Sequence, residues 1–159
     1  MPRQVLSPQV SVDRWLAPWT RFLRAHTAVT RKLSSRLESE HGLTLSDFDV
    51  LAQLHAAPEH ALRRVDLARS VLLSASGITR LLEGLERCGW VEKRRCATDA
   101  RVTYAALTPV GIEKFEAARA THVEDVEELF GSRFDDAELA VLAELLARLP
   151  LAESIACSE

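Results

Sequence analysis

Apolar residues recur at spacings of three and four over residues 11–40, which is the period of one face of an α-helix. The stripe consists of Trp15, Trp19, Phe22, His26, Val29, Leu33 and Leu37. Pro18 lacks the amide hydrogen of a helix interior, so two starts are open: near residue 11, or at Thr20 after a short helix. Gly42 is expected to end the helix, because glycine readily adopts the left-handed conformation of that position.

Shorter apolar patterns follow this long helix. Ser46 and Asp49 have the spacing of a capping box, which predicts a helix running to His55. Its inward residues are Phe48, Leu51 and Leu54. After a proline at position 58, residues 62–64 are interpreted as a short strand and residues 66–71 as a small helix, with Leu67 and Ala68 facing inward.

The pattern over residues 74–111 predicts a helix, a strand, a charged loop, a second strand and the start of another helix. Ser74 caps the first helix, whose buried stripe consists of Ile78, Leu81, Leu82 and Leu85. Gly89 lets the chain reverse into strands at 90–95 and 102–107, joined by a polar loop. Thr108 and Pro109 then supply a hydroxyl cap and a first-turn proline. This order is typical of a winged helix-turn-helix within a mainly α (α+β) fold.

The chain closes with a helix over 109–130 and a last helix that ends before Pro150. The last helix has inward leucines at Leu139, Leu142, Leu146 and Leu149. The small winged domain cannot cover these stripes alone, so we predict a two-fold homodimer built by both chain ends. The alternative is that the terminal helices fold back onto their own winged domain.

The predicted organisation therefore has a central domain between two dimerisation regions. Residues 45–108 form the DNA-binding winged helix-turn-helix, residues 11–44 and 109–150 serve dimerisation, and residues 151–159 form a tail. A chain of 159 residues suits one domain plus such an oligomerisation extension.

Composition narrows the class of protein. Hydrophobic residues make up 47% and charged residues 27% of the chain, which excludes a disordered protein. No apolar run approaches the roughly 18–20 residues of a membrane span, and the first residues lack the basic start of a signal peptide. We therefore expect a cytoplasmic protein with no membrane partner.

The net charge of −3 is unevenly distributed. Residues 1–62 carry +1, residues 63–101 carry +4 and residues 102–159 carry −8. Binding to phosphates needs local positive charge and not a basic protein, and here the positive segment coincides with the predicted winged domain. Double-stranded DNA is therefore the expected partner.

Residues that would read DNA follow from this layout, because a helix-turn-helix places the start of its second helix in the major groove. These residues are Ser74, Ala75, Ser76, Gly77, Thr79 and Arg80. Arginine can pair with O6 and N7 of guanine, which makes Arg80 the expected base contact. The alternative is an ordinary exposed arginine that pairs with Glu83 or Glu86.

The predicted wing tip carries Asp99 two residues before Arg101, so the carboxylate can brace the guanidinium as it enters the minor groove. A solvated turn with a weak surface ion pair is the alternative. Further basic residues are expected to contact the DNA backbone: Arg63, Arg64, Arg69, Lys93, Arg94 and Arg95.

Three segments together resemble the MarR family of bacterial transcription regulators. They are residues 76–94, the run Asp99-Ala-Arg101, and the run from Leu107 to Gly111. The resemblance implies a triangular homodimer that regulates transcription from a pseudo-palindromic operator, and we expect a repressor. It also implies that Arg101 is the minor-groove arginine and Asp99 its brace. This chain departs from the family at Ala100, where arginine is frequent, and at Arg95, where proline is frequent.

The resemblance further implies release from DNA by a small aromatic or phenolic acid. Candidate pocket residues are Trp15, Trp19, Phe22 and His26, although their spacing favours the alternative that they form the dimer core.

Other functions receive less support from the residues. A redox-responsive regulator would act through Cys96 or Cys88, but basic neighbours alone do not establish a reactive thiol. Glu40, His41 and His122 lack the local spacing of a zinc site, so we predict no metal and no cofactor. No glycine-rich phosphate loop, nucleophile elbow or HExxH motif is present, which argues against an enzyme. A winged helix used for protein contacts stays open as an alternative.

Overall fold

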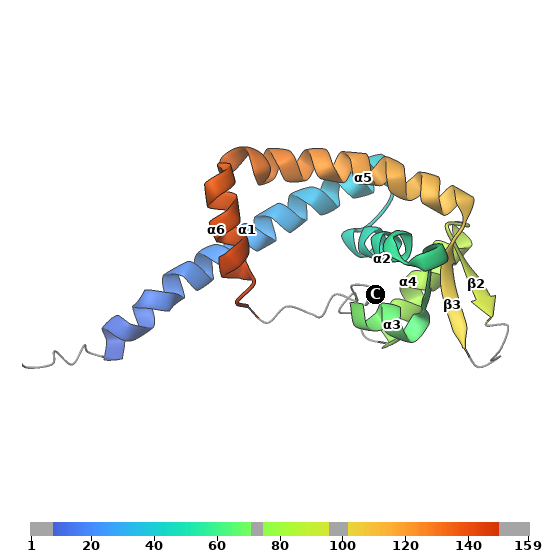
Figure 1. Ribbon diagram of the computed structural model, residues 1–159, viewed down its shortest axis with the longest axis horizontal. Helices are drawn as coiled ribbons and strands as arrows, with labels where there is room; N and C mark the ends of the chain where they lie inside the picture. The colour runs from blue at the N-terminus through green and yellow to red at the C-terminus, as the bar shows by residue number, and fades with distance from the viewer. Residues whose placement is uncertain (1–7, 71–74, 96–101, 150–159) are drawn as a thin grey trace, which may run out of the picture.

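The computed structural model describes residues 8–70, 75–95 and 102–149. Two long helices, α1 (Pro8–His41) and α5 (Pro109–Leu129), lie against each other, and α6 (Asp136–Leu146) descends across α1 (Figure 1). A smaller body at one end holds α2 (Leu45–Ala56), α3 (Arg64–Ser70), α4 (Ala75–Arg87) and the strands. Two 3-10 turns, η1 (Pro58–His60) and η2 (Gly131–Arg133), complete the path. None of the described helices combines the length and apolarity needed to cross a membrane.

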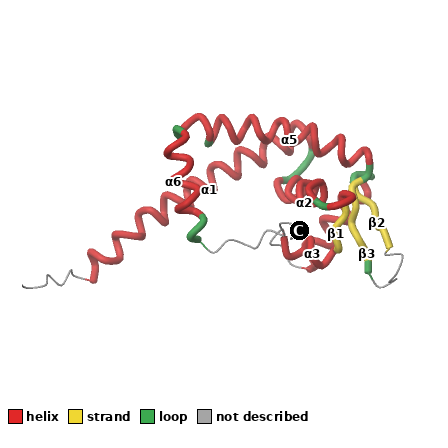
Figure 2. Tube along the Cα trace, viewed as in Figure 1, coloured by secondary structure: helices red, strands yellow, loops and turns green. Residues whose placement is uncertain are grey.

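A three-stranded antiparallel sheet lies at the end of the smaller body (Figure 2). The order is β1 (Ala61–Arg63), β3 (Thr103–Leu107), β2 (Val91–Arg95), and β2 and β3 form the hairpin predicted as the wing. The short strand begins and ends one residue earlier than predicted, and it ends at Arg63 because Arg64 already belongs to α3. The predicted mainly α winged helix-turn-helix architecture is confirmed.

The first helix is continuous through Pro18, so the alternative start at Thr20 is wrong. A proline at position 18 removes the hydrogen bond to the carbonyl of Arg14, four residues earlier. Arg14 and Pro18 are both exposed, so that carbonyl lies on a face that water can reach.

The link between α1 and α2 is built from two caps. Gly42 has a φ of 63°, and the amide of Leu43 donates to the carbonyl of Leu37 as in a Schellman motif. Thr44 and Asp47 form the capping box of α2, two residues before the predicted pair of Ser46 and Asp49. Both pairs have the same spacing, and the tight link after Gly42 decides which pair caps the helix.

Asp49 has a different environment from the one predicted for it. It lies inside α2, where burial raises the pKa of its carboxyl and a hydrogen bond from Gln53 partly offsets that rise. Asp49 is therefore a partly buried residue in the middle of the helix and does not cap it.

The hydrophobic core lies where the smaller body meets the long helices. It unites Leu37, Leu43, Phe48, Leu51, Leu54, Leu67, Ile78, Leu82, Leu85, Val91, Leu107 and Phe115, among others. The three predicted residues of α2 and the predicted stripe of α4 are thus inside, with Leu81 partly buried at the edge. This core fixes α4 and the wing relative to the end of α1.

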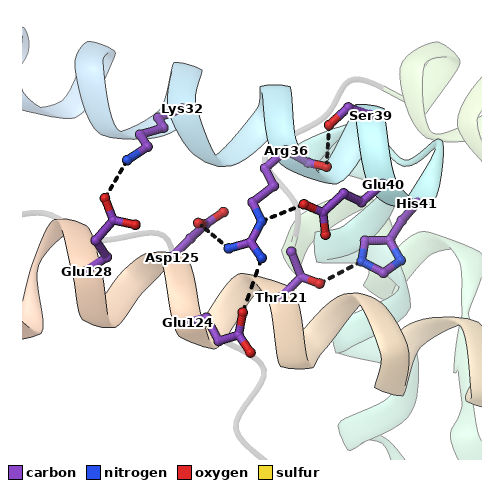
Figure 3. A network of polar contacts seen from close by, with 9 residues as sticks. All are labelled: Lys32, Arg36, Ser39, Glu40, His41, Thr121, Glu124, Asp125 and Glu128. Carbon is purple, nitrogen blue, oxygen red and sulfur yellow. Dashed lines mark hydrogen bonds and ion pairs between the residues drawn. The ribbon is translucent and has the colours of Figure 1, made fainter.

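A polar network joins α1 to α5 (Figure 3). The Arg36 guanidinium donates to Glu40 (2.8 Å), to Asp125 (2.8 Å) and to Glu124 (3.2 Å). Asp125 is only 2% exposed, so Arg36 compensates a charge that would be costly to bury alone. Hydrogen bonds to Glu40 and Asp125 raise the pKa of Arg36 further above its usual range.

Two further contacts extend this network along the helices. Lys32 pairs with Glu128 at 2.7 Å, and the His41 ring lies 2.8 Å from the Thr121 hydroxyl (Figure 3). His122 packs against Phe48 with 4.4 Å between ring centroids, and burial lowers the pKa of His122. His41 and His122 therefore hold structural positions between helices.

The last helix is only partly buried within one chain. Leu139, Leu142 and Leu146 are partly buried, whereas Leu149 lies beyond the helix end and is 44% exposed. Asp135 and Glu138 form the capping box that begins α6. The leucine stripe of α6 is thus only partly covered within one chain, and its coverage by a second copy stays a prediction.

Gly111 in the first turn of α5 lies against the backbone that enters β2. A Cβ built at Gly111 would stand 1.9 Å from the Trp90 carbonyl oxygen, which accepts a hydrogen bond from the Thr108 amide. Only a hydrogen atom fits there, so this glycine sets how closely α5 approaches the wing.

We predict that Gly111→Ala lowers the free energy of unfolding by about 1–3 kcal/mol, because the backbone of β2 must move. The control is Gly84→Ala in α4, where a Cβ meets nothing nearer than an Arg87 nitrogen at 4.0 Å. That variant should gain about 0.5–1 kcal/mol from helix propensity. Urea unfolding followed by circular dichroism measures both, and equal stabilities would contradict the packing argument.

Candidate nucleic-acid interface

Helices α3 and α4 have the arrangement of a helix-turn-helix, with residues 71–74 between them. Helix α4 buries Ile78, Leu82 and Leu85 against the core. Its opposite face carries Thr79 and Arg80, which are both exposed. The face that would enter a major groove is therefore free of core packing.

The predicted reading residues lie at the start of this helix. Ala75 and Ser76 belong to the first turn of α4, and Gly77 follows them, partly buried. Ser74, the predicted cap, lies outside the described residues.

Arg80 is available for DNA in the described part of the chain. Neither Glu83 nor Glu86 forms an ion pair with it, and Glu86 pairs instead with Lys93 on β2 at 2.9 Å. The alternative in which Arg80 is engaged by these glutamates is therefore wrong for this structure.

The wing hairpin is held in register from Val91 opposite Leu107 to Arg95 opposite Thr103. Its loop, residues 96–101, carries the predicted tip residues Asp99 and Arg101, and both lie outside the described residues.

Basic residues predicted as backbone contacts fall into two groups. Arg69 on α3 and Arg95 on β2 are exposed, and Arg63 on β1 is exposed as well. Arg94 pairs with Glu92 at 2.8 Å, and Lys93 is the partner of Glu86.

Arg64 differs from these residues because it is partly buried at the start of α3. One of its terminal nitrogens is buried with no hydrogen-bond partner in the structure. Arg64 is therefore less accessible to a phosphate than the exposed Arg63 and Arg69.

Sequence reasoning missed the bridge between Lys93 and Glu86, which joins the wing to the reading helix. The two residues lie on different elements and seven positions apart, so no local pattern marks the pair. The alternation of β2 is the one available signal, since it places Lys93 and Val91 on the same face of the strand.

A separate groove of about 830 Å³ lies between α1, the end of α5 and α6. Phe22 and His26, two of the four predicted pocket residues, line it together with Phe130, Phe134, Leu142 and Leu146. Lys32, Arg21 and Arg133 add positive charge to its walls. Trp15 and Trp19 do not line this groove, because they lie further along α1, where they are 59% and 50% exposed.

Cys88 is exposed just after α4, whereas Cys96 and Cys157 lie outside the described residues. In the part of the chain that the structure describes, no cluster of three or more His, Cys, Asp or Glu side chains could hold a metal ion. Glu40, His41 and His122, the set considered from sequence, thus do not form such a cluster.

Comparisons with known proteins agree with this geometry. A MarR family model matches residues 41–102, which span the helix-turn-helix and the wing loop. The HTH-type transcriptional repressor YetL of Bacillus subtilis is 28% identical over 127 residues, which cover 76% of this chain and 76% of YetL.

Two solved structures extend the similarity to the long helices. Sco3205, a MarR family transcriptional regulator from Streptomyces coelicolor in complex with DNA, is 25% identical with a TM-score of 0.79, covering 83% of this chain and 86% of that one. A mutant MarR from E. coli complexed with operator DNA is 26% identical with a TM-score of 0.74, covering 85% and 96%. Residues 41–102 thus match the MarR family, and the described chain has the fold of DNA-bound MarR family transcription regulators.

Proposed function

We propose that this regulator is a cytoplasmic repressor that binds a pseudo-palindromic operator as a homodimer. The main observation behind this proposal is the surface of α4. One face of the helix exposes Thr79 and Arg80, and the opposite face is buried in the hydrophobic core. DNA in the structures of Sco3205 and MarR, and the repressor activity named for YetL, support the same role.

In this proposal the first turn of α4 reads base edges and the wing loop contacts the minor groove. Ser74, Ala75, Ser76, Gly77, Thr79 and Arg80 form the reading set, and Arg101 braced by Asp99 forms the wing contact. Arg63, Arg69 and Arg95 are placed to neutralise phosphates, because they are exposed on the elements that flank α4.

The dimer is proposed to use both chain ends, residues 11–44 and 109–150. The apolar stripe of α1 is buried at Leu33 and Leu37 and bare at Trp15 and Trp19, although it is one continuous face. A second copy that covers the bare half would complete this stripe and set the spacing of the two reading helices.

A small aromatic acid is proposed to release the operator by binding in the groove beside α1. Phe22 and Phe130 offer aromatic walls, and Arg21 and Arg133 offer positive charge for a carboxylate. Binding there would act on α1 and α6, and through them on the distance between the two reading heads.

For DNA binding, we predict that Arg80→Ala weakens operator binding by roughly 1–3 kcal/mol and relaxes preference at one base position. Arg101→Ala should weaken binding and reduce the slope of log affinity against log salt by about one or less. Fluorescence anisotropy over a salt series, on sites enriched from the genome, measures both. Arg119→Ala on α5, where the guanidinium pairs with Glu116 at 3.5 Å, is the control, and parental binding by both test variants would refute the proposed DNA contacts.

For the dimer, we predict that Trp15→Ala and Trp19→Ala each weaken self-association by about 2 kcal/mol, as expected when a buried indole is lost from an interface. Val65→Ala is the control, since Val65 is similarly exposed but lies on α3. Sedimentation velocity over a concentration series checks the result. A monomeric parent chain at micromolar concentration would refute the dimer.

For the effector, we predict that benzoate-like carboxylates displace the protein from its operator, whereas cyclohexanecarboxylate does so less effectively. Phe130→Ala should reduce the response, because its ring forms part of the groove wall. Operator release is measured by anisotropy at constant ionic strength. If aromatic acids act no better than their saturated counterparts, the groove is not an aromatic effector site.

A further inference from the structure

Lys93 on β2 and Glu86 on α4 form an ion pair of 2.9 Å that links the wing to the reading helix. The Lys93 side chain is half exposed, whereas the Glu86 side chain is 18% exposed and its Oε1 atom is buried without a hydrogen-bond partner. Glu86 also lies in the last turn of α4, where the negative end of the helix dipole disfavours a carboxylate. The ammonium of Lys93 therefore stabilises a charge that would be costly for the reading helix alone.

This ion pair acts at the point where the wing leaves the hydrophobic core. Gly89, with a φ of 74°, turns the chain from α4 into β2, and Val91 is buried in the same core as Leu85 of α4. Lys93 lies two residues further on the same face of the strand, and it reaches the same helix. A strand held at one residue can pivot about it, whereas a strand held at two successive residues of one face has a fixed direction.

Toward the wing loop the hairpin is less supported. Arg94 and Arg95 on β2 are exposed, and Thr103 opposite Arg95 is only partly buried. Arg94 pairs with Glu92 of its own strand, which adds no connection to α4. Within the described residues, the ion pair of Lys93 is thus the ionic contact nearest to the loop that joins β2 to the reading helix.

We propose that Lys93 and Glu86 are positioning residues for DNA recognition: their ion pair sets the angle between β2 and α4, and with it the place where the wing loop meets the minor groove. The inference rests on the proposed DNA-binding function and gives Lys93 a role other than a phosphate contact. A wing held at one angle meets flanking base pairs at a fixed distance from those that α4 reads. Because the width of the minor groove depends on base sequence, this angle contributes specificity for the flanking pairs.

A phosphate contact is the competing role for Lys93. It would require the ammonium to leave Glu86, and the carboxylate would then stay partly buried at the negative end of α4 without a cation. Arg69 and Arg95 are exposed on the same body and can neutralise phosphates without that cost. The ion pair with Glu86 therefore favours a supporting role for Lys93.

Substitutions at the two positions separate these roles in the full-length chain. Glu86→Gln and Lys93→Met each remove one charge of the pair, and Glu86→Lys/Lys93→Glu restores the pair with its charges exchanged. The control is Glu92→Gln, which changes the net charge as Glu86→Gln does but removes the partner of Arg94 within β2. Fluorescence anisotropy is measured on two forms of an operator enriched from the genome, with A·T or with G·C pairs at the flanks that the wing contacts.

Glu86→Gln and Lys93→Met should each weaken binding to the preferred form about three- to tenfold and bring the affinities for the two forms closer together. The exchanged pair should recover the preference and most of the lost affinity, and Lys93→Arg should bind like the parent. Glu92→Gln should bind at least as tightly as the parent, because it removes a negative charge from a surface that faces phosphates. Preference at the base positions read by α4 should stay unchanged in every variant, and circular dichroism verifies that each variant is folded.

Other results overturn the inference in distinguishable ways. Tighter binding by Glu86→Gln would assign Lys93 to a phosphate for which Glu86 competes. Equal weakening on both forms of the operator, with no recovery by the exchanged pair, would make the ion pair a support of the fold alone, and variants that bind like the parent would remove it from recognition. A parent chain that binds neither form would refute the proposed DNA-binding function itself.

Discussion

The buried ion pair between Arg36 and Asp125 is the contact on which the arrangement of this molecule depends. Asp125 is almost fully buried on α5, and a carboxylate in that environment is stable only if a cation and hydrogen bonds accompany it. Arg36 on α1 supplies the cation and a hydrogen bond to Oδ1 (Figure 3). Helix α1 leads into α2, and α5 follows the wing. Because Arg36 and Asp125 hold α1 and α5 together, they also fix the smaller body of α2, α3, α4 and the strands at the joined ends of these helices.

Within this smaller body, each element has one face toward the hydrophobic core and one face toward solvent. Helix α4 is held by Ile78, Leu82 and Leu85, and the bridge from Lys93 to Glu86 ties β2 to the same helix. Gly111 allows α5 to approach the start of β2 closely. The reading helix and the wing therefore share one rigid support, and a displacement of the long helices would move them together.

The long helices have apolar surface that stays exposed to solvent in a single chain. The α1 stripe changes from core to exposed surface along its length, from Leu37 at 0% to Trp15 at 59% exposure. The charges follow the same division, since α1 is basic while α6 is acidic. An interface of this kind would connect ionic strength to assembly, and assembly to the spacing of the two reading heads that a pseudo-palindromic operator requires.

Local patterns in the sequence determined the identity and order of the elements, because helix period, glycine φ preference and hydroxyl caps act within a few residues. The stripe of α4, the Gly42 and Gly89 turns and the Thr108-Pro109 start were all predictable in this way. The candidate DNA contacts likewise follow from position within a recognised layout of elements.

Tertiary structure decided what depends on residues far apart in the chain. The pairing of Arg36 with Asp125 spans 89 positions, and the bridge from Lys93 to Glu86 joins a strand to a helix. The choice of Thr44 over Ser46 as a cap, and the partial exposure of α6, depend on which neighbours are present to pack against. Sequence alone thus specified the local elements and their winged helix-turn-helix order, whereas burial and long-range charge pairing, which require the folded chain, decided how α4 and the wing are held.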